Sequence, residues 1–183
     1  MKIFFPDIGS LMLFCFQLNI QPELRCPHCH KHDQFTLHDF IYKGVKKTEV
    51  GKRLLCSNRN GHSGCGRTIR LYISQRVPQL VYSSIELTAF LLALINGLSI
   101  TQAYQDATGT FEPRNAYRWL DKLKSRLSAF RHYLTTPCSQ SVERFSHRIR
   151  GLRLLLPTLE RLFSSPSQHS CACFQNFHQK AFF

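Results

Sequence analysis

The stretch Cys26-Pro27-His28-Cys29, followed by Cys56 and Cys65, decides the fold of this chain. Two residues separate the cysteines of the first pair, eight separate those of the second, and 26 residues lie between the pairs. Zn²⁺ takes four tetrahedral ligands, and two thiolates from each tight turn supply them with little chain strain. The spacing predicts one structural Zn²⁺ held by Cys26, Cys29, Cys56 and Cys65.

The fourth ligand has a rival in His62, because Cys56 and His62 are also spaced to close a turn. Cys65 is preferred, since Cys65-Gly66-Arg67-Thr68 leads directly into a predicted strand. The alternatives to a metal site are four buried cysteines without metal, or disulfides, which need an oxidising compartment. A catalytic zinc site is not expected, because four thiolate ligands leave no open position on the ion.

Residues 25–78 read as a small β module around these cysteines. Phe35–Tyr42, Arg53–Cys56 and Thr68–Ile73 are short runs rich in apolar and β-branched residues, as strands require. Three short antiparallel strands around a cysteine-ligated metal describe a zinc ribbon. Such a module is too small to be held by apolar burial alone, and zinc binding typically contributes on the order of 10 kcal/mol to its folding.

Three helices are predicted over residues 83–134. Ser83-x-x-Glu86 and Ser99-x-x-Gln102 are capping boxes that begin the first two, and Thr108-Gly109 ends the second. Pro113 lies near the first turn of the third predicted helix, which is expected to run to about Leu134. A short second helix, a glycine-containing turn and a basic third helix match the layout of a helix-turn-helix domain. An ordinary three-helix bundle with a solvated polar face is the alternative.

The remaining segments complete an α+β chain. Residues 1–24 are a hydrophobic lead, expected to be a buried segment rather than a signal peptide, and 75–82 look like a linker. Residues 135–183 are expected to hold a linker, a helical segment over 143–163 divided at Pro157, and a poorly ordered tail from Ser164.

A strongly basic composition predicts a polyanionic partner. The formal net charge is +13, and residues 25–78 carry 11 Lys and Arg against 3 Asp and Glu, a net of +8. Basic and amide side chains near the start of the third helix are the candidates for reading base edges, with basic residues of the ribbon expected to contact phosphates. The predicted base-edge residues are Arg114, Asn115, Tyr117, Arg118 and Lys122, and the phosphate contacts are Lys46, Lys47, Arg67 and Arg70.

The sequence also argues against a membrane protein and against an enzyme. The apolar run Leu87–Ile100 is shorter than the roughly 20 residues of a membrane span. Nucleases and transposases generally need two or three carboxylates around a divalent metal, yet after Asp121 the only acidic residues are Glu143 and Glu160. We therefore expect a cytoplasmic protein without catalytic activity.

Several motifs together resemble the N-terminal region of bacterial insertion-sequence transposases, and the short zinc-ribbon and helix-turn-helix proteins that such elements encode. The motifs are Cys-Pro-His-Cys at 26–29, Arg-Leu-Leu-Cys at 53–56, Cys-Gly-Arg-Thr at 65–68, Asn-Gly-Leu-Ser-Ile-Thr-Gln-Ala at 96–103 and Asn-Ala-Tyr-Arg-Trp-Leu at 115–120. The resemblance covers roughly residues 25–130. It departs from the family at the second cysteine pair, which is usually tighter.

The resemblance implies a sequence-specific DNA-binding protein of a mobile element. Its partners would be double-stranded DNA at the element ends or promoter, and a full-length transposase or a second copy of itself. It would act in transposition or in repression of the transposase, and would be associated with the bacterial nucleoid. The alternative is a zinc-ribbon transcription activator that contacts RNA polymerase, since the four-cysteine module is also similar to that of phage late-gene activators.

Overall fold

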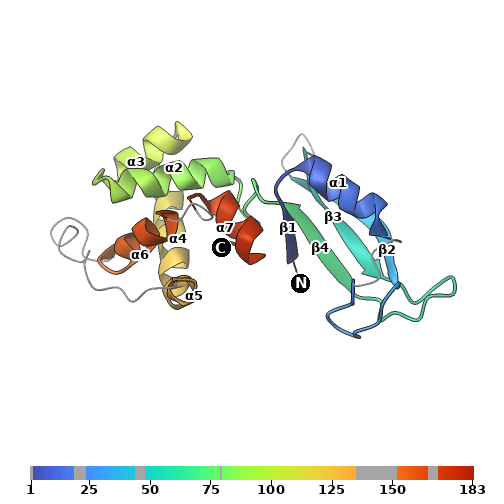
Figure 1. Ribbon diagram of the computed structural model, residues 1–183. Coiled ribbons are helices and arrows are strands. Elements are labelled where there is room, and N and C mark those ends of the chain that lie inside the picture. Colours follow the sequence, from blue (N-terminus) through green and yellow to red (C-terminus); the bar gives the residue numbers. More distant parts are fainter. Residues whose placement is uncertain (1, 19–23, 44–47, 79, 135–151, 165–168) are drawn as a thin grey trace.

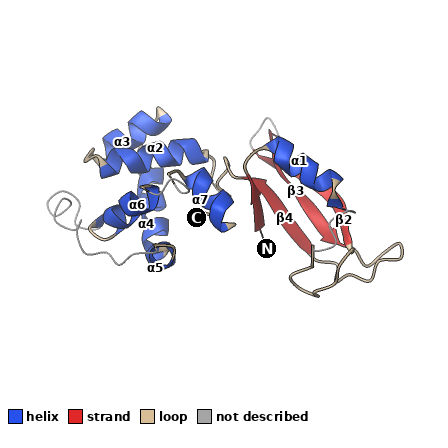
Figure 2. Cartoon of the chain, in the orientation of Figure 1, coloured by secondary structure: helices blue, strands red, loops and turns tan. Residues whose placement is uncertain are grey.

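The computed structural model describes residues 2–18, 24–43, 48–78, 80–134, 152–164 and 169–183, which fold into two lobes (Figure 1). The first, the sheet lobe, holds four strands and one helix, and the second, the helical lobe, holds the other six helices of the described residues (Figure 2). The predicted α+β class is confirmed.

A mixed sheet forms the base of the first lobe. Its strands are β1 (Lys2–Phe5), β2 (Phe35–Lys43), β3 (Thr48–Cys56) and β4 (Thr68–Ile73), in the order β1-β4-β3-β2. β2, β3 and β4 pair antiparallel, as predicted, whereas β1 pairs parallel to β4. The prediction of three strands is wrong by one, because the hydrophobic lead supplies the edge strand β1.

Helix α1 (Ile8–Phe16) covers one face of this sheet. Asp7 caps its first turn by accepting a hydrogen bond from the Ser10 N–H at 2.8 Å. Leu11 is fully buried in a cluster with Leu54 and Ile69 of the sheet. The lead is therefore part of the sheet lobe, and its strand and helix enlarge the apolar core beyond that of a three-stranded ribbon.

The helical lobe surrounds an aromatic core. Trp119 packs edge-on against the rings of Tyr82, Phe90 and Tyr104, with centroids 5.2–5.5 Å apart. Such ring pairs add to the stabilisation from apolar burial. The helices are α2 (Ser84–Ile95), α3 (Ile100–Thr108), α4 (Arg114–Ser125), α5 (Leu127–His132), α6 (Leu155–Phe163) and α7 (Cys171–His178).

The predicted helix boundaries follow from local capping chemistry. Ser83 and Glu86 form the expected capping box at α2, and the Ser99 side chain accepts from the Gln102 N–H at α3. Gly109 ends α3 in the left-handed conformation, with φ 68°. The third predicted helix differs: it divides at Arg126 into α4 and α5 instead of running unbroken to Leu134.

The C-terminal segment and the predicted linker at 75–82 are both packed. The expectation of a poorly ordered tail is wrong for residues 169–183, which form α7 and bury Phe174 and Phe182 in the helical core. Val77 in the linker is also fully buried there. Ser170 caps α7, an N-terminal signal that the sequence reading missed. Residues 135–151, with the predicted linker and part of the 143–163 helix, lie outside the described residues.

No helix among the described residues combines the length and apolar composition that crossing a bilayer requires.

Candidate metal centre and basic surface

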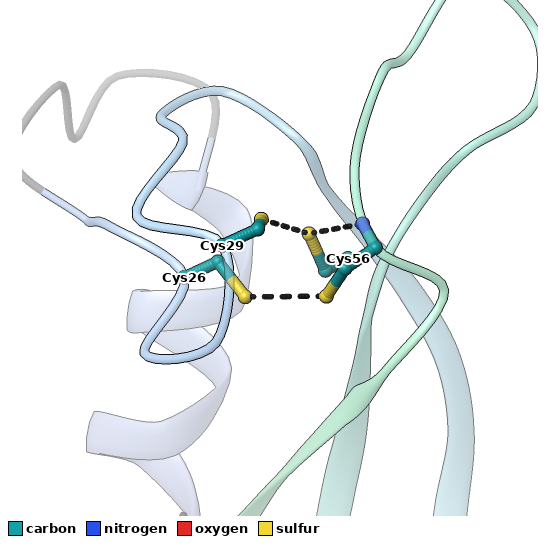
Figure 3. Close-up of side chains that lie close together, drawn as sticks. Cys26, Cys29 and Cys56 are labelled. Atoms are coloured by element: carbon teal, nitrogen blue, oxygen red, sulfur yellow. Dashed lines mark hydrogen bonds between the residues drawn. The ribbon is translucent and has the colours of Figure 1, made fainter.

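Four cysteine sulfurs meet at one end of the sheet lobe. Cys26 and Cys29 lie in the loop before β2, Cys56 ends β3, and Cys65 lies in the loop before β4. The Sγ atoms of Cys26 and Cys65 are 3.7 Å apart, and those of Cys29 and Cys56 are 3.6 Å apart (Figure 3). All four sulfurs lie within 4.8 Å of one another. We call these residues the four-cysteine group.

The geometry of this group fits a single metal ion. Four thiolates placed tetrahedrally about 2.3 Å from a central ion have edges of about 3.8 Å. The Cys26–Cys65 and Cys29–Cys56 sulfur pairs are close to that length, and the other pairs are no longer than 4.8 Å. The four cysteines therefore lie close enough together to hold one metal ion.

A backbone hydrogen bond closes the segment that supplies each pair of ligands. In the first, the His30 N–H donates to the Cys26 carbonyl at 2.8 Å, and in the second the Gly66 N–H donates to the Cys56 carbonyl at 2.8 Å. His30 and Gly66 each follow the last cysteine of their pair, and both have positive φ, 59° and 72°. The left-handed residue turns the chain away directly after the second ligand, so two sulfurs from each turn point inward.

Gly64 is a site residue that the sequence reading did not single out. A Cβ at this position would lie 2.3 Å from the Ser57 carbonyl oxygen and 2.6 Å from the Cys56 sulfur. Only glycine therefore fits, and its own N–H donates to the Ser57 carbonyl at 2.7 Å. The sequence signal was present, a glycine directly before the fourth cysteine, but the close approach is visible only in the fold.

Cys26 and Cys56 differ in their ease of ionisation. Burial opposes ionisation of Cys26, but hydrogen bonds from the backbone at His28 and Cys29 and from neighbouring thiols lower its pKa to about 7. Burial raises the pKa of Cys56, and the neighbouring thiols raise it further. One thiolate therefore forms readily at neutral pH, and a bound cation would favour ionisation of the others.

His62 and His28, which are near the four cysteines in sequence, contact other groups than the four sulfurs. His62, the rival for the fourth ligand, lies with Nδ1 3.2 Å from the Asp33 carbonyl oxygen and is not among the residues that converge with the sulfurs. His28 Nδ1 lies 3.1 Å from Arg67 Nη1. This arrangement favours Cys65 over His62.

Helix α4 has a buried apolar side and an exposed side that carries basic residues. Ala116, Trp119, Leu120 and Leu123 are buried in the helical core. The predicted contacts Arg114, Tyr117, Arg118 and Lys122 are exposed on the rest of the helix.

Asn115 differs from the other predicted base-edge residues. Its side chain is partly buried, and hydrogen bonding to it lowers the pKa of Tyr104, a phenol whose pKa is raised chiefly by burial. Its amide is therefore engaged with the aromatic core of the lobe.

The structure describes two of the four predicted phosphate contacts of the sheet lobe. Arg67 and Arg70 are exposed, Arg67 beside the four-cysteine group and Arg70 on β4. Lys46 and Lys47 lie outside the described residues.

Comparison of the chain with protein-family models, with curated proteins and with solved structures finds no match.

Proposed function

We propose that this chain is a DNA-binding protein, in which one structural Zn²⁺ orders the end of the sheet lobe and α4 contacts the major groove. The observation that carries the proposal is the division of α4 into a buried apolar side and an exposed side with Arg114, Arg118 and Lys122. Arg can bridge guanine through two hydrogen bonds, and Lys supplies charge for phosphates. A short α3, the Gly109 turn and α4 follow the order of a helix-turn-helix.

Zn²⁺ is the metal that the four-cysteine group favours. Thiolate ligands select soft or borderline ions, and a tetrahedral four-sulfur site is typical of zinc or iron–sulfur centres. In this proposal the ion is structural, because the four sulfurs would fill its coordination shell. A zinc-ribbon and helix-turn-helix protein of a bacterial insertion sequence, binding element ends or promoter without catalysing strand transfer, is the role that the motifs support.

The test is a salt titration of DNA binding. Fluorescence anisotropy of a labelled 24-bp duplex should show affinity that falls linearly with the logarithm of salt concentration, because binding releases counterions from phosphates. Arg118→Gln should weaken binding and lower the slope, whereas Arg59→Gln, an exposed loop arginine of the same charge, should do neither. Absence of duplex binding at low salt would reject the proposal.

A second candidate, an activator that docks on RNA polymerase, is favoured by α1. Leu13 and Phe16 on this helix are 58% and 77% exposed, as an apolar protein contact requires. Capture of purified polymerase by a chain that does not bind DNA would support it over the first proposal.

A further inference from the structure

A row of like charges crosses the face of the sheet opposite α1. Lys2 on β1 lies directly across from Arg70 on β4, and Arg70 lies across from Arg53 on β3. Directly opposed residues point to the same face of a sheet and lie about 5 Å apart at Cβ. Their sequence neighbours Ile69, Leu71 and Leu54 instead pack on the α1 side. The three cations therefore share the face that α1 does not cover.

Only part of this charge is offset within the described residues. Arg53 donates to Asp39 at 2.8 Å, a partly exposed ion pair. No carboxylate of the described residues pairs with Lys2 or Arg70. Like charges directly opposite each other destabilise a sheet, so a row of this kind is relieved when an anion binds across it.

The row continues onto the helical lobe through Arg126. This residue ends α4 and lies close enough to Lys2 for the two charges to act on each other. Burial lowers the pKa of Lys2, and the positive charges of Arg70 and Arg126 lower it further. The positive charge of Arg126, a partly buried residue at the end of α4, therefore acts on Lys2 of the sheet lobe.

Arg126 is also one end of a basic line along α4. Arg118, Lys122 and Arg126 recur every four residues, so they lie near one another on the same side of the helix over about 12 Å. The Lys122 ammonium lies over the ring of Phe183, 5.9 Å from its centroid. Asp121, the acidic residue of this helix, pairs with Lys124 at 3.3 Å.

We propose that Arg70, Lys2, Arg126, Lys122 and Arg118 form one basic surface along a single DNA duplex: Arg118 and Lys122 lie on the helix that contacts the groove, and Arg126, Lys2 and Arg70 contact phosphates of the same duplex. This inference rests on the proposed DNA-binding function and adds to it: the cations on the face of the sheet opposite α1, rather than the four-cysteine end, carry the second contact. Duplex DNA is the occupant because its closely spaced phosphates complement an extended line of cations. We name these five residues the basic track.

The proposal predicts that charges on the sheet contribute to the same binding event as charges on α4. The probe is the 24-bp labelled duplex, and the variants are Lys2→Gln, Arg70→Gln and their double, with Arg59→Gln as the matched charge control. Each single change should lower the magnitude of the salt slope by about 1, and the double by about 2. Arg126→Gln is a further variant, and the fluorescence of Trp119, the only tryptophan, reports whether the helical lobe stays folded.

The outcomes separate the two proposals. If the unmodified chain binds no duplex, the proposed function fails, and the basic track with it. If it binds and Arg118→Gln weakens binding while the Lys2 and Arg70 variants match Arg59→Gln, the basic track is overturned and the proposed function stands. Binding to anionic vesicles of phosphatidylcholine and phosphatidylserine that only the Lys2/Arg70 double variant loses, with DNA binding unchanged, would overturn the track in favour of a membrane surface.

Discussion

Gln179 and Phe4, 175 residues apart in sequence, exchange two hydrogen bonds. The Phe4 N–H donates to the Gln179 side-chain oxygen at 2.7 Å, and the Gln179 amide nitrogen donates to the Phe4 carbonyl at 2.8 Å. The amide of Gln179 thereby bonds the outward-facing N–H and carbonyl of Phe4 on the edge strand β1, as a neighbouring strand would. The C-terminal segment of the helical lobe is thus bonded directly to the sheet.

Gln175 makes the second link between the lobes and gives a prediction on stability. Its fully buried amide nitrogen donates to the carbonyls of Ser74 and Arg76 at 2.8 and 3.0 Å, and its oxygen accepts from the Phe182 N–H. Gln175→Ala would leave buried groups unpaired, at about 1–3 kcal/mol each, so the free energy of unfolding should fall by about 2–4 kcal/mol. Urea denaturation followed by Trp119 fluorescence measures this change.

Gln75→Ala is the control for that experiment, because Gln75 is exposed and its backbone carbonyl, which the substitution keeps, accepts the hydrogen bonds from Ser84. It should change the free energy of unfolding by less than about 0.5 kcal/mol. Equal effects of the two substitutions would show that the Gln175 bonds do not hold the lobes together.

Gly64→Ala tests the packing around the four-cysteine group. The added methyl would overlap the Ser57 carbonyl oxygen and the Cys56 sulfur, so the second turn must move away from the first. Disturbing the groups that orient metal ligands typically costs on the order of 10–100-fold in metal affinity. Competition against a chromogenic zinc chelator measures the loss.

Gly61→Ala is the comparison for Gly64→Ala. Gly61 lies in the same loop, and a Cβ there meets no atom within 4 Å, although its φ of 85° makes any side chain strained. This substitution should lower stability slightly and leave zinc affinity within about threefold of the unmodified chain. A Gly64→Ala protein that competes for zinc as well as Gly61→Ala does would contradict the site geometry.

His178 should make the helical lobe sensitive to acid. Burial lowers the pKa of its imidazole, which packs on Tyr133 and Phe174, and its Nε2 is buried without a hydrogen-bond partner in the described residues. The unfolded chain therefore binds more protons as the pH falls through about 6.5. The contribution of this residue to stability is complete above that pH and is lost below it.

The measurement is the urea midpoint of Trp119 fluorescence at pH 7.5 and at pH 5.5. The midpoint should fall on acidification, and it should fall less in His178→Phe, which keeps an aromatic ring and cannot be protonated. Identical pH dependence in the two proteins would show that His178 does not titrate in its buried position.

Local signals predicted much of this fold, and contacts between distant segments account for the rest. Thr68–Ile73 was bounded correctly because its alternation reflects one covered face, and Ser83 and Ser99 were identified because capping involves residues three apart. β1 was missed because four residues carry no periodicity, and its pairing with β4 joins segments far apart in sequence. α7 was missed because its composition looks aperiodic, and its burial depends on partners in α2 and α5.

The candidate site also has one part that local sequence signals predict and one part that depends on contacts between distant segments. The four cysteines were found from their spacing, which reflects two turns with the same chemistry. Which basic residues share a surface was beyond the sequence, because it depends on strand register and on where α4 ends. Lys52, for example, is one of the basic residues of 25–78, yet it is buried and its ammonium lies over the ring of Phe40, 4.1 Å from the centroid.

One Zn²⁺ joined to two pairs of thiolates is the central feature that we propose for this chain, and X-ray absorption at the zinc edge tests it most directly. Protein purified without added chelator should contain one zinc per chain, surrounded by four sulfur atoms at about 2.3 Å. Cys56→Ser should lose the metal, and Cys15→Ser, a buried cysteine of the same lobe outside the four-cysteine group, should keep it. A shell containing nitrogen, or purified protein without metal that folds normally, would contradict the account.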